Sequence, residues 1–413
     1  MDNNEVNQTP AGREALRIIA TLKQNGHTAF LAGGCVRDAL LNLPVKDFDV
    51  ATEATPPEVR RIFGRGRTLA IGESFGVIAV LPTGRDSGLP PTEVATFRSD
   101  GSYSDGRRPD SVQYGDDRAD ALRRDFTING MFYDPAEERI IDHVGGIDDL
   151  HAGVLRTIGS ATRRFAEDQL RMLRAIRFAT TKLMSIDSAT FQAIGTCSAN
   201  IATVSEERIG QEMRRLIADR RRCDGLRLLI RSGLATHVWP GLEEGQIDAA
   251  EKRILEDSDL SPVVALAALL LDREDADGQL RTLAKRWRLS NAERDRVGFA
   301  IEGVSMFRRS NELPWHQLQP VLVHRFVDDA VQLAGAVCEA SLIDQVNEWL
   351  SLDRETLDPP PLIDGGDLKA LGVPAGPVYR TVLEKVRRMQ LDGEIPGRAE
   401  ALKVVQQEMP RDR

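Results

Sequence analysis

Two aspartates stand two positions apart in the stretch KDFDV, residues 46–50. Alternate residues of a β-strand point to the same face, so Asp47 and Asp49 would present two carboxylates side by side. Such oxygen ligands suit Mg²⁺, which takes one or two carboxylates and completes its shell with water and substrate phosphates. Taken alone, the pair is also explained by a solvated strand end.

A glycine pair lies a short distance upstream, in the stretch LAGGCVRD at residues 31–38. Gly33 and Gly34 stand between a strand-like run and a helical pattern, where they allow a ligand close to the backbone and N–H groups favour a phosphate. Arg37 would add a charged fork. A tight turn with Arg37 paired to a surface carboxylate is the alternative. The acid pair that follows favours a phosphate turn.

A third motif, LRRDFTIN at residues 122–129, places Arg124 and Asp125 next to each other between apolar residues. Arg124 has the donors to hold a triphosphate or a ribose. Asp125 has the acceptors to bond a sugar hydroxyl or to orient Arg124. An internal salt bridge that braces a sheet explains the motif equally well.

The fourth motif, EDQLRMLRAIRF at residues 167–178, is expected to be helical, with Asp168 and Arg171 neighbouring on one face and Arg174 and Arg177 continuing the strip. A carboxylate only accepts hydrogen bonds and a guanidinium only donates them. Cytosine and adenine present an amino donor beside a ring-nitrogen acceptor, whereas uracil and guanine present a carbonyl beside an N–H. The pair would therefore select C and A, although a salt-bridged exposed face remains open.

With LAGGCVRDALLNLPVKDFDVAT, RRDFTING, GGIDDL and EDQLRMLRAIRF in this order, the sequence resembles the class II tRNA nucleotidyltransferase / poly(A) polymerase family. The stretch GGDLKALGVPAGPVYRTVLEKVRRMQLDGEI near the C-terminus looks like the body and tail of its bacterial CCA-adding members. The resemblance therefore covers nearly the whole chain. It implies an α+β fold, in which a polymerase-β-like nucleotidyltransferase head with an antiparallel sheet precedes an all-helical neck, body and tail.

The resemblance also implies a role for each motif. Asp47 and Asp49 match the catalytic acids that bind Mg²⁺, and Glu93 is a further candidate ligand. The matching nucleotide-binding residues are Gly33, Gly34, Arg37, Arg124, Asp125, Asp168, Arg171, Arg174 and Arg177. Within that set, Asp168 and Arg171 would read the incoming base in place of a nucleic acid template.

The activity implied is template-independent addition of C, C and A, from CTP and ATP, to the 3′ acceptor end of tRNA, with release of pyrophosphate. An enzyme that adds only the A, a poly(A) polymerase and a non-catalytic RNA-binding protein are the alternatives. Residues 69–78 lack the basic pair typical of the poly(A) polymerase branch, which favours the tRNA branch. The loop expected at residues 98–117, part of which is lost in members that add only CC, looks complete, so A addition should be intact. The sequence does not separate CCA addition from addition of A alone. The sequence indicates neither an obligate protein partner nor membrane association.

The elements that must position these residues change in class along the chain. Strand-like runs alternate with Gly, Pro and Asp up to about residue 150, and apolar residues recur at helical spacing from Ala161 onward. Proline-containing breaks at residues 239–241, 311–314 and 358–361 divide the helical part. We expect a head at 1–150, a neck at 151–231, a body at 232–310 and a tail, which would bind tRNA, at 311–413.

The charge distribution agrees with an RNA partner only when it is counted by region. The whole chain of 413 residues carries −9, but residues 151–231 carry +7, between flanks of −7 and −9. The four cysteines form no CxxC pair, the N-terminus has no apolar leader region, and the longest apolar run, residues 262–271, is too short to cross a bilayer. We therefore expect a cytoplasmic protein without structural zinc or disulfides.

Overall fold

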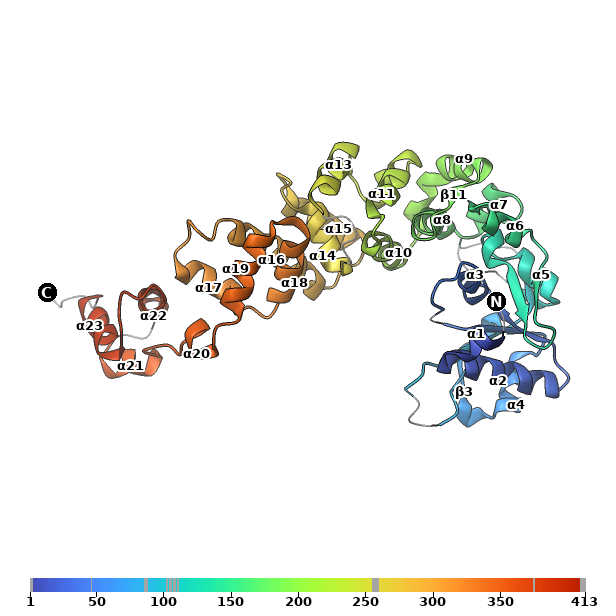
Figure 1. Ribbon diagram of the computed structural model, residues 1–413, viewed down its shortest axis with the longest axis horizontal. Coiled ribbons are helices and arrows are strands. Elements are labelled where there is room, and N and C mark those ends of the chain that lie inside the picture. Colours follow the sequence, from blue (N-terminus) through green and yellow to red (C-terminus); the bar gives the residue numbers. More distant parts are fainter. Residues whose placement is uncertain are drawn as a thin grey trace. The chain divides into compact units, whose positions relative to one another are not determined.

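The computed structural model describes residues 3–45, 47–84, 88–101, 103, 106, 109, 111–254, 260–373 and 376–408. It divides into two compact units, Met1–Leu216 with Asp224–Leu242, and Ile217–Cys223 with Glu243–Arg413 (Figure 1). The expected division into head, neck, body and tail is finer than these two units and stays a prediction.

The first unit is built on a seven-stranded sheet with the order β3-β4-β5-β2-β1-β8-β9. Two small sheets, β6-β7 and β10-β11, accompany it. The strands are β1 Ala29–Ala32, β2 Asp49–Thr52, β3 Thr68–Gly72, β4 Val77–Val80, β5 Thr92–Thr96, β6 Arg98–Asp100, β7 Val112–Tyr114, β8 Met131–Asp134, β9 Arg139–Asp142, β10 Val154–Leu155 and β11 Ser185–Ile186.

The main sheet is antiparallel except between β2 and β5, which run parallel. Parallel neighbours need a crossover, and here the helix α4, Pro56–Phe63, and the β3-β4 hairpin lie between the two strands in the sequence. The loop expected at residues 98–117 begins and ends in the strands β6 and β7. Six of its residues, at 102, 104, 105, 107, 108 and 110, lie outside the described residues.

An aromatic cluster under the sheet places the strand that carries the acid pair. Phe30, Phe97 and Phe132 meet with ring centroids 5.9 to 6.2 Å apart, and Ala32 and Ala51 complete the layer. Ala32 of β1 is paired with Asp49 of β2, and paired residues point to the same face of a sheet. Asp49 therefore stands beside this packed layer.

Helices surround the sheet and then replace it. The α-helices that lie wholly in the first unit are α1 Asn3–Asn7, α2 Pro10–Gln24, α3 Gly34–Leu40, α4 Pro56–Phe63, α5 Asp117–Leu122, α6 Gly146–His151, α7 Ala161–Glu167, α8 Leu170–Thr181, α9 Ser188–Cys197 and α12 Ala235–Val238. Two more helices, α10 Glu206–Ala218 and α11 Arg222–Arg231, contain residues of both units. Short 3₁₀ turns occur at Arg65–Arg67, Glu73–Phe75, Thr127–Asn129 and Ser198–Thr203. After α6, the described strands of this unit are the two-residue strands β10 and β11, as the change in pattern predicted.

The described residues of the second unit form helices joined by turns and loops, without strands. Its helices are α13 Glu244–Arg253, α14 Pro262–Leu270, α15 Ala276–Arg286, α16 Asn291–Arg308, α17 Trp315–Leu322, α18 Val327–Val337, α19 Ala340–Leu350, α20 Arg354–Leu357, α21 Gly365–Ala370, α22 Pro377–Leu391 and α23 Arg398–Glu408. The three expected breaks fall between α12 and α13, between α16 and α17, and between α20 and α21.

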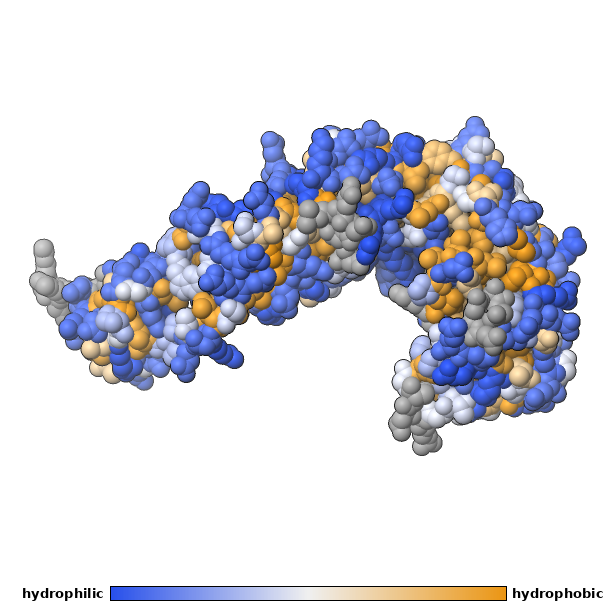
Figure 2. Space-filling view, viewed as in Figure 1, coloured by the Kyte–Doolittle hydropathy of each residue, from blue (hydrophilic) through white to orange (hydrophobic). Residues whose placement is uncertain are grey.

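The apolar run of the second unit forms a buried helix. Val263 to Leu270 in α14 are all buried, and α14 packs against α16 and α18. A separate cluster that includes Leu368, Val382 and Val405 forms the core at the C-terminal end. On the face shown in Figure 2 the side chains of this unit are mainly hydrophilic. Among the described residues, none of the helices is both long and apolar enough to span a bilayer.

We predict that Phe132→Ala lowers the free energy of unfolding of the first unit by about 3–5 kcal/mol, because it leaves a cavity between the rings of Phe30 and Phe97. Urea unfolding followed by circular dichroism measures the change. Ile71→Ala is the control, because this side chain is 77% exposed, and it should shift the value by less than about 0.5 kcal/mol. Equal effects of the two variants would contradict the packing described above.

Candidate active site

The acid pair opens into a small cavity on the sheet. Asp47, Asp49 and Glu93 line a cavity of about 260 Å³. The spacing predicted both acids on one face of a strand, but this is wrong for Asp47: Asp49 is the first residue of β2, and Asp47 lies just before the strand. Val50 is paired with Val94, which places Asp49 next to Glu93 across the two strands. The structure thus brings Glu93 to the two predicted acids.

These three carboxylates form an acceptor-rich, incomplete set of ligands. The Asp49 side chain reaches solvent, but it stands in a concave site where it loses part of its hydration. This desolvation and the repulsion from Glu93 and Asp47 raise the pKa of Asp49 to about 6, although the positive charge of Arg124 acts in the opposite direction. Within the described ranges, no three or more His, Cys, Asp and Glu side chains are grouped so that they could hold a metal ion by themselves. Mg²⁺ needs no such group when phosphates and water supply its other ligands. The residues therefore fit a magnesium ion that arrives with a nucleotide.

A larger cavity of about 570 Å³ adjoins the acids, and Asp49 lines both cavities. All nine predicted nucleotide-binding residues line the larger cavity. Its lining contains eight arginines and three aspartates. The lining thus carries a net positive charge, which suits a triphosphate. The arginines are Arg37, Arg123, Arg124, Arg171, Arg174, Arg177, Arg208 and Arg215.

The glycine turn is required by the arginine that stands over it. Gly33 caps α3 with φ +71°, and a Cβ at this position would lie 2.8 Å from Nη1 of Arg124. A side chain at position 33 is therefore strained by the backbone conformation, and it would also push the Arg124 guanidinium away from its present place. At Gly34 a Cβ would meet Arg37 at 3.7 Å, an ordinary contact. Arg37 is buried, and it donates to Oδ1 of Asn129 at 2.5 Å and to Oδ1 of Asp38 at 2.8 Å.

Arg124 and Asp125 do not pair with each other, so the interpretation in which Asp125 orients Arg124 directly is wrong, whereas Asp125 does form an internal ion pair with Arg174. Arg124 donates to Oδ2 of Asp120, at 2.9 and 3.1 Å, and to the carbonyl of Asn129. Asp125 instead accepts two hydrogen bonds from Arg174 at Oδ2, at 2.6 and 2.9 Å, and two at Oδ1 from the Phe126 backbone and the Asn129 amide. Neighbours in sequence point in different directions here, so each finds a partner elsewhere.

The fourth motif is not one helix. The helix α7 ends at Glu167, Asp168 has extended dihedral angles, and α8 begins at Leu170. Oδ1 of Asp168 accepts the backbone N–H of Leu170 at 3.1 Å, a local bond by which aspartate competes with helix formation. Arg171 in α8 donates to Glu167 at 2.8 Å and to the carbonyls of Arg164 and Arg123. Asp168 and Arg171 still line the same cavity.

The other two arginines of this motif surround an aromatic ring. Arg174 and Arg177 lie 5.2 and 3.9 Å from the ring centroid of Phe178, and Arg37 lies at 5.0 Å. Arg177 also donates to the buried Glu212 at 2.5 Å. Phe178 and Glu212 thus hold guanidinium groups from two helices at the cavity.

Five residues at the site were not identified from the sequence: Asp120, Asn129, Phe178, Arg208 and Glu212. A signal existed for Arg208 and Glu212, which share a helix face with Arg215. Arg208, Glu212 and Arg215 follow the spacing i, i+4, i+7, which places charged groups on one face of α10. Charged residues with that spacing are equally common on helix faces that point to solvent. The spacing therefore indicates a functional site only when the helix packed against that face is known.

Comparisons with known proteins agree with this geometry. Residues 29–156 match the model of the poly A polymerase head domain, and residues 184–245 match that of a probable RNA and SrmB binding site of polymerase A. The CCA-adding enzyme of Lactiplantibacillus plantarum is 32% identical over 406 residues, which is 96% of this chain and 96% of that enzyme. The chain belongs to the family of CCA-adding enzymes.

Other CCA-adding enzymes match over a similar length. The one from Geobacillus stearothermophilus is 32% identical over 95% of this chain and 96% of its own. The crystal structure of the Bacillus stearothermophilus CCA-adding enzyme in complex with CTP superposes with a TM-score of 0.80 at 28% identity, covering 97% and 98% of the two chains. The Thermotoga maritima CCA-adding enzyme complexed with tRNA has a TM-score of 0.64 at 19% identity, with 98% of each chain covered, which bears on the fold.

We predict that Asp125→Asn destabilises this CCA-adding enzyme family member in a pH-dependent way. Burial alone would raise the pKa of Asp125, but Arg174 and the hydrogen bond from Asn129 outweigh it and lower the pKa to about 2. Its ionic contribution of about 2 kcal/mol is fully present above the unfolded-state pKa of about 3.9 and is lost as the pH falls through about 2.

Urea unfolding of both proteins at pH 7 and pH 3 measures this difference, which should shrink by about half at pH 3. Asp148→Asn, an exposed change in the same unit, should stay within about 0.5 kcal/mol of wild type at both values. A loss in Asp125→Asn that is independent of pH would show that the ion pair is not its source.

Proposed function

We propose that this chain adds CCA to the 3′ end of tRNA, with CTP and ATP as substrates and pyrophosphate as the second product. The observation that carries the proposal is the juxtaposition of the acid cavity with the arginine-lined cavity, joined at Asp49, in a member of the CCA-adding enzyme family. The nucleotide and the 3′ end of the tRNA can therefore approach Asp49 from different cavities. The nucleotide suits the basic side, because its triphosphate needs guanidinium donors.

Asp47 and Asp49, with Glu93 beside them, would hold Mg²⁺. When bound, the metal supplies positive charge that acidifies the attacking 3′-hydroxyl and neutralises charge on the α-phosphate and the leaving pyrophosphate. The 3′-oxygen forms a bond to the α-phosphorus of CTP or ATP while the bond from that phosphorus to the bridging oxygen breaks. The hydroxyl proton is lost to solvent.

The protein's own groups orient the triphosphate. Arg37 and Arg124 stand beside the turn at Gly33, where the backbone is bare enough for a phosphate to approach. Arg174 and Arg177 extend the donor set along α8. Because their carboxylate partners and the Phe178 ring already hold several of these guanidiniums, little reorganisation is needed when charge develops in the transition state.

Base selection is assigned to Asp168 and Arg171. Asp168 accepts from the exocyclic amino group of cytosine or adenine, and Arg171 donates to the neighbouring ring nitrogen. Uracil and guanine would place a carbonyl against the carboxylate and an N–H against the guanidinium. The mismatch leaves polar groups unpaired inside the cavity, which strongly disfavours both bases.

The remaining expectations complete the proposal. Residues 1–150 would form the catalytic head and 151–231 the base-reading neck, with a body at 232–310 and a tRNA-binding tail at 311–413. We place the reaction in the cytoplasm. An enzyme that adds A alone would use the same pocket residues, and a poly(A) polymerase would use the same acids, so product length distinguishes the three activities.

We predict that the protein, given tRNAs that end at the discriminator base, at C and at CC, completes all three to CCA when CTP and ATP are both present. CTP alone should add two residues to the first tRNA and stop, and ATP alone should extend only the tRNA that ends in CC. Denaturing gels read the product lengths. Extension of the CC end alone would identify an A-adding enzyme, long tails a poly(A) polymerase, and no extension a non-catalytic protein.

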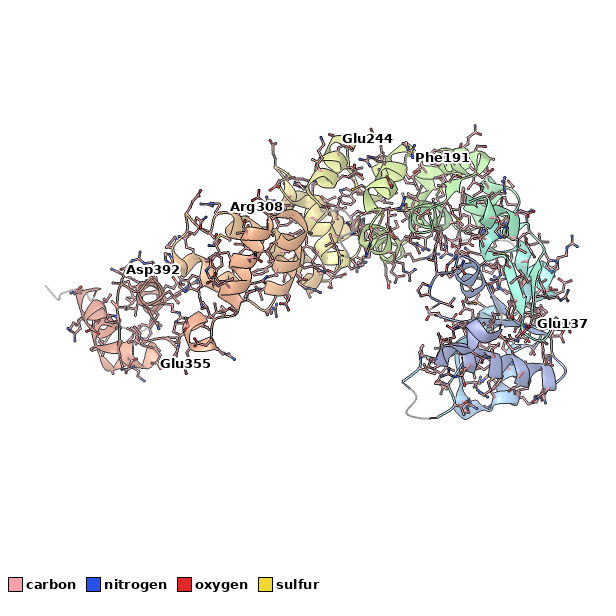
Figure 3. The ribbon with its side chains drawn as sticks, viewed as in Figure 1. Glu137, Phe191, Glu244, Arg308, Glu355 and Asp392 are labelled. Atoms are coloured by element: carbon pink, nitrogen blue, oxygen red, sulfur yellow. The ribbon has the colours of Figure 1, made fainter. Side chains whose placement is uncertain are left out.

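We also predict that Asp47→Asn and Asp49→Asn each lower incorporation at least ~100-fold, because the charge on the leaving and attacking oxygens loses its counter-ion. Magnesium-dependent CTP binding, measured by calorimetry, should weaken in both variants, while tRNA binding in gel shifts stays measurable. Glu137→Gln is the control. This residue, labelled in Figure 3, lies between β8 and β9 outside both cavities. Near-normal incorporation by both aspartate variants would exclude the acid pair from the reaction.

A further inference from the structure

We propose that Arg208 is a positioning residue that orients the carboxylate of Asp168 for base selection. This inference deepens the proposed function and rests on it. It concerns a residue of α10, which lies 40 positions beyond Asp168 in the sequence.

Asp168 needs an external partner because no helix holds it. The residue has φ −149° and ψ 105°, and it lies in the link between α7 and α8. One local bond, from the N–H of Leu170 to Oδ1, restrains its side chain. A single bond to one oxygen leaves the plane of the carboxylate free to turn about that contact.

Arg208 supplies the missing restraint through a two-point contact. Its Nη1 donates to Oδ1 of Asp168 at 3.1 Å, and its Nη2 donates to Oδ2 at 2.8 Å. Two parallel bonds between a planar guanidinium and a planar carboxylate fix the plane of both groups. The two side chains are 21% and 16% exposed, so the pair is largely shielded from water.

The arrangement leaves acceptor capacity for a base. Each carboxylate oxygen can accept about two hydrogen bonds. Arg208 takes one at each oxygen and Leu170 a second at Oδ1, so Oδ2 keeps a free lone pair in a fixed direction. An amino group of cytosine or adenine can use that acceptor, whereas the carbonyl of uracil cannot.

The two halves of the base-reading pair are held independently. Arg171 is fixed by Glu167 and by two backbone carbonyls, and Asp168 is fixed by Arg208. The loss of Arg208 would therefore disturb the acceptor half and leave the donor half in place. The alternative role for Arg208, which also lines the cavity, is direct contact with the triphosphate.

The test compares Arg208→Gln and Arg208→Lys with wild type. For each, kcat/KM is measured with CTP, ATP, UTP and GTP on tRNAs that end at the discriminator base and at CC. We expect the preference for CTP over UTP to fall about tenfold in both variants, because a lysine keeps the charge but not the fork. Thermal melting identifies a variant that fails to fold, and the other variant then carries the test.

Two further variants separate positioning from phosphate contact. Arg215→Gln removes an arginine from the same helix and the same cavity, one whose partner is Glu212 at 3.6 Å, and it should leave the CTP to UTP preference at the wild-type value. The double variant Asp168→Asn with Arg208→Gln should match Asp168→Asn alone in that preference, because Arg208 acts through the carboxylate.

The outcomes are distinct. An unchanged preference in Arg208→Gln with a KM raised equally for all four nucleotides would overturn the proposal in favour of phosphate contact, and so would additive losses in the double variant. Wild-type protein that adds neither C nor A would instead contradict the proposed function itself.

Discussion

The ion pair between Asp125 and Arg174 connects the two halves of the candidate active site. Asp125 follows α5 and belongs to the motif at residues 122–129, whereas Arg174 lies in the middle of α8. Both oxygens of Asp125 are fully used, by the arginine on one side and by local N–H groups on the other. Because separation would leave the buried Asp125 carboxylate without its counter-charge, the triphosphate side and the base-reading side of the cavity are held in one arrangement.

The sequence was informative wherever chemistry depends on neighbouring residues. The spacing of Asp47 and Asp49, the glycines at 33 and 34 and the arginine repeat of α8 can each be interpreted over a few positions, and all line the two cavities. The resemblance to a known family then placed the motifs in one site. The backbone at Asn42 has a φ of +55°, a left-handed conformation in which asparagine is enriched among residues other than glycine.

The sequence was less informative about which charges pair. Asp120 stands four positions before Arg124, a spacing that pairs charges on a helix, and Asp125 directly follows Arg124. The sequence does not show that Arg124 takes the first and that Arg174, 49 positions away, takes the second. The sequence also did not predict the break between α7 and α8 at Asp168. The motif has helical periodicity on both sides, and a side-chain bond to Leu170 interrupts it locally. Pairings over 40 or 49 positions depend on the packing of α8, α10 and the sheet edge.

The close approach of Gly33 to Arg124 links two positions that are far apart in the chain. Any side chain at position 33 would meet Nη1 of Arg124 at 2.8 Å, and Arg124 cannot move away freely because Asp120 and the carbonyl of Asn129 tether it. A mutation in the glycine turn therefore acts as a mutation of the arginine as well. The dependence runs in one direction: a side chain at position 33 needs Arg124 to move, whereas the glycine itself places no demand on the residue at position 124.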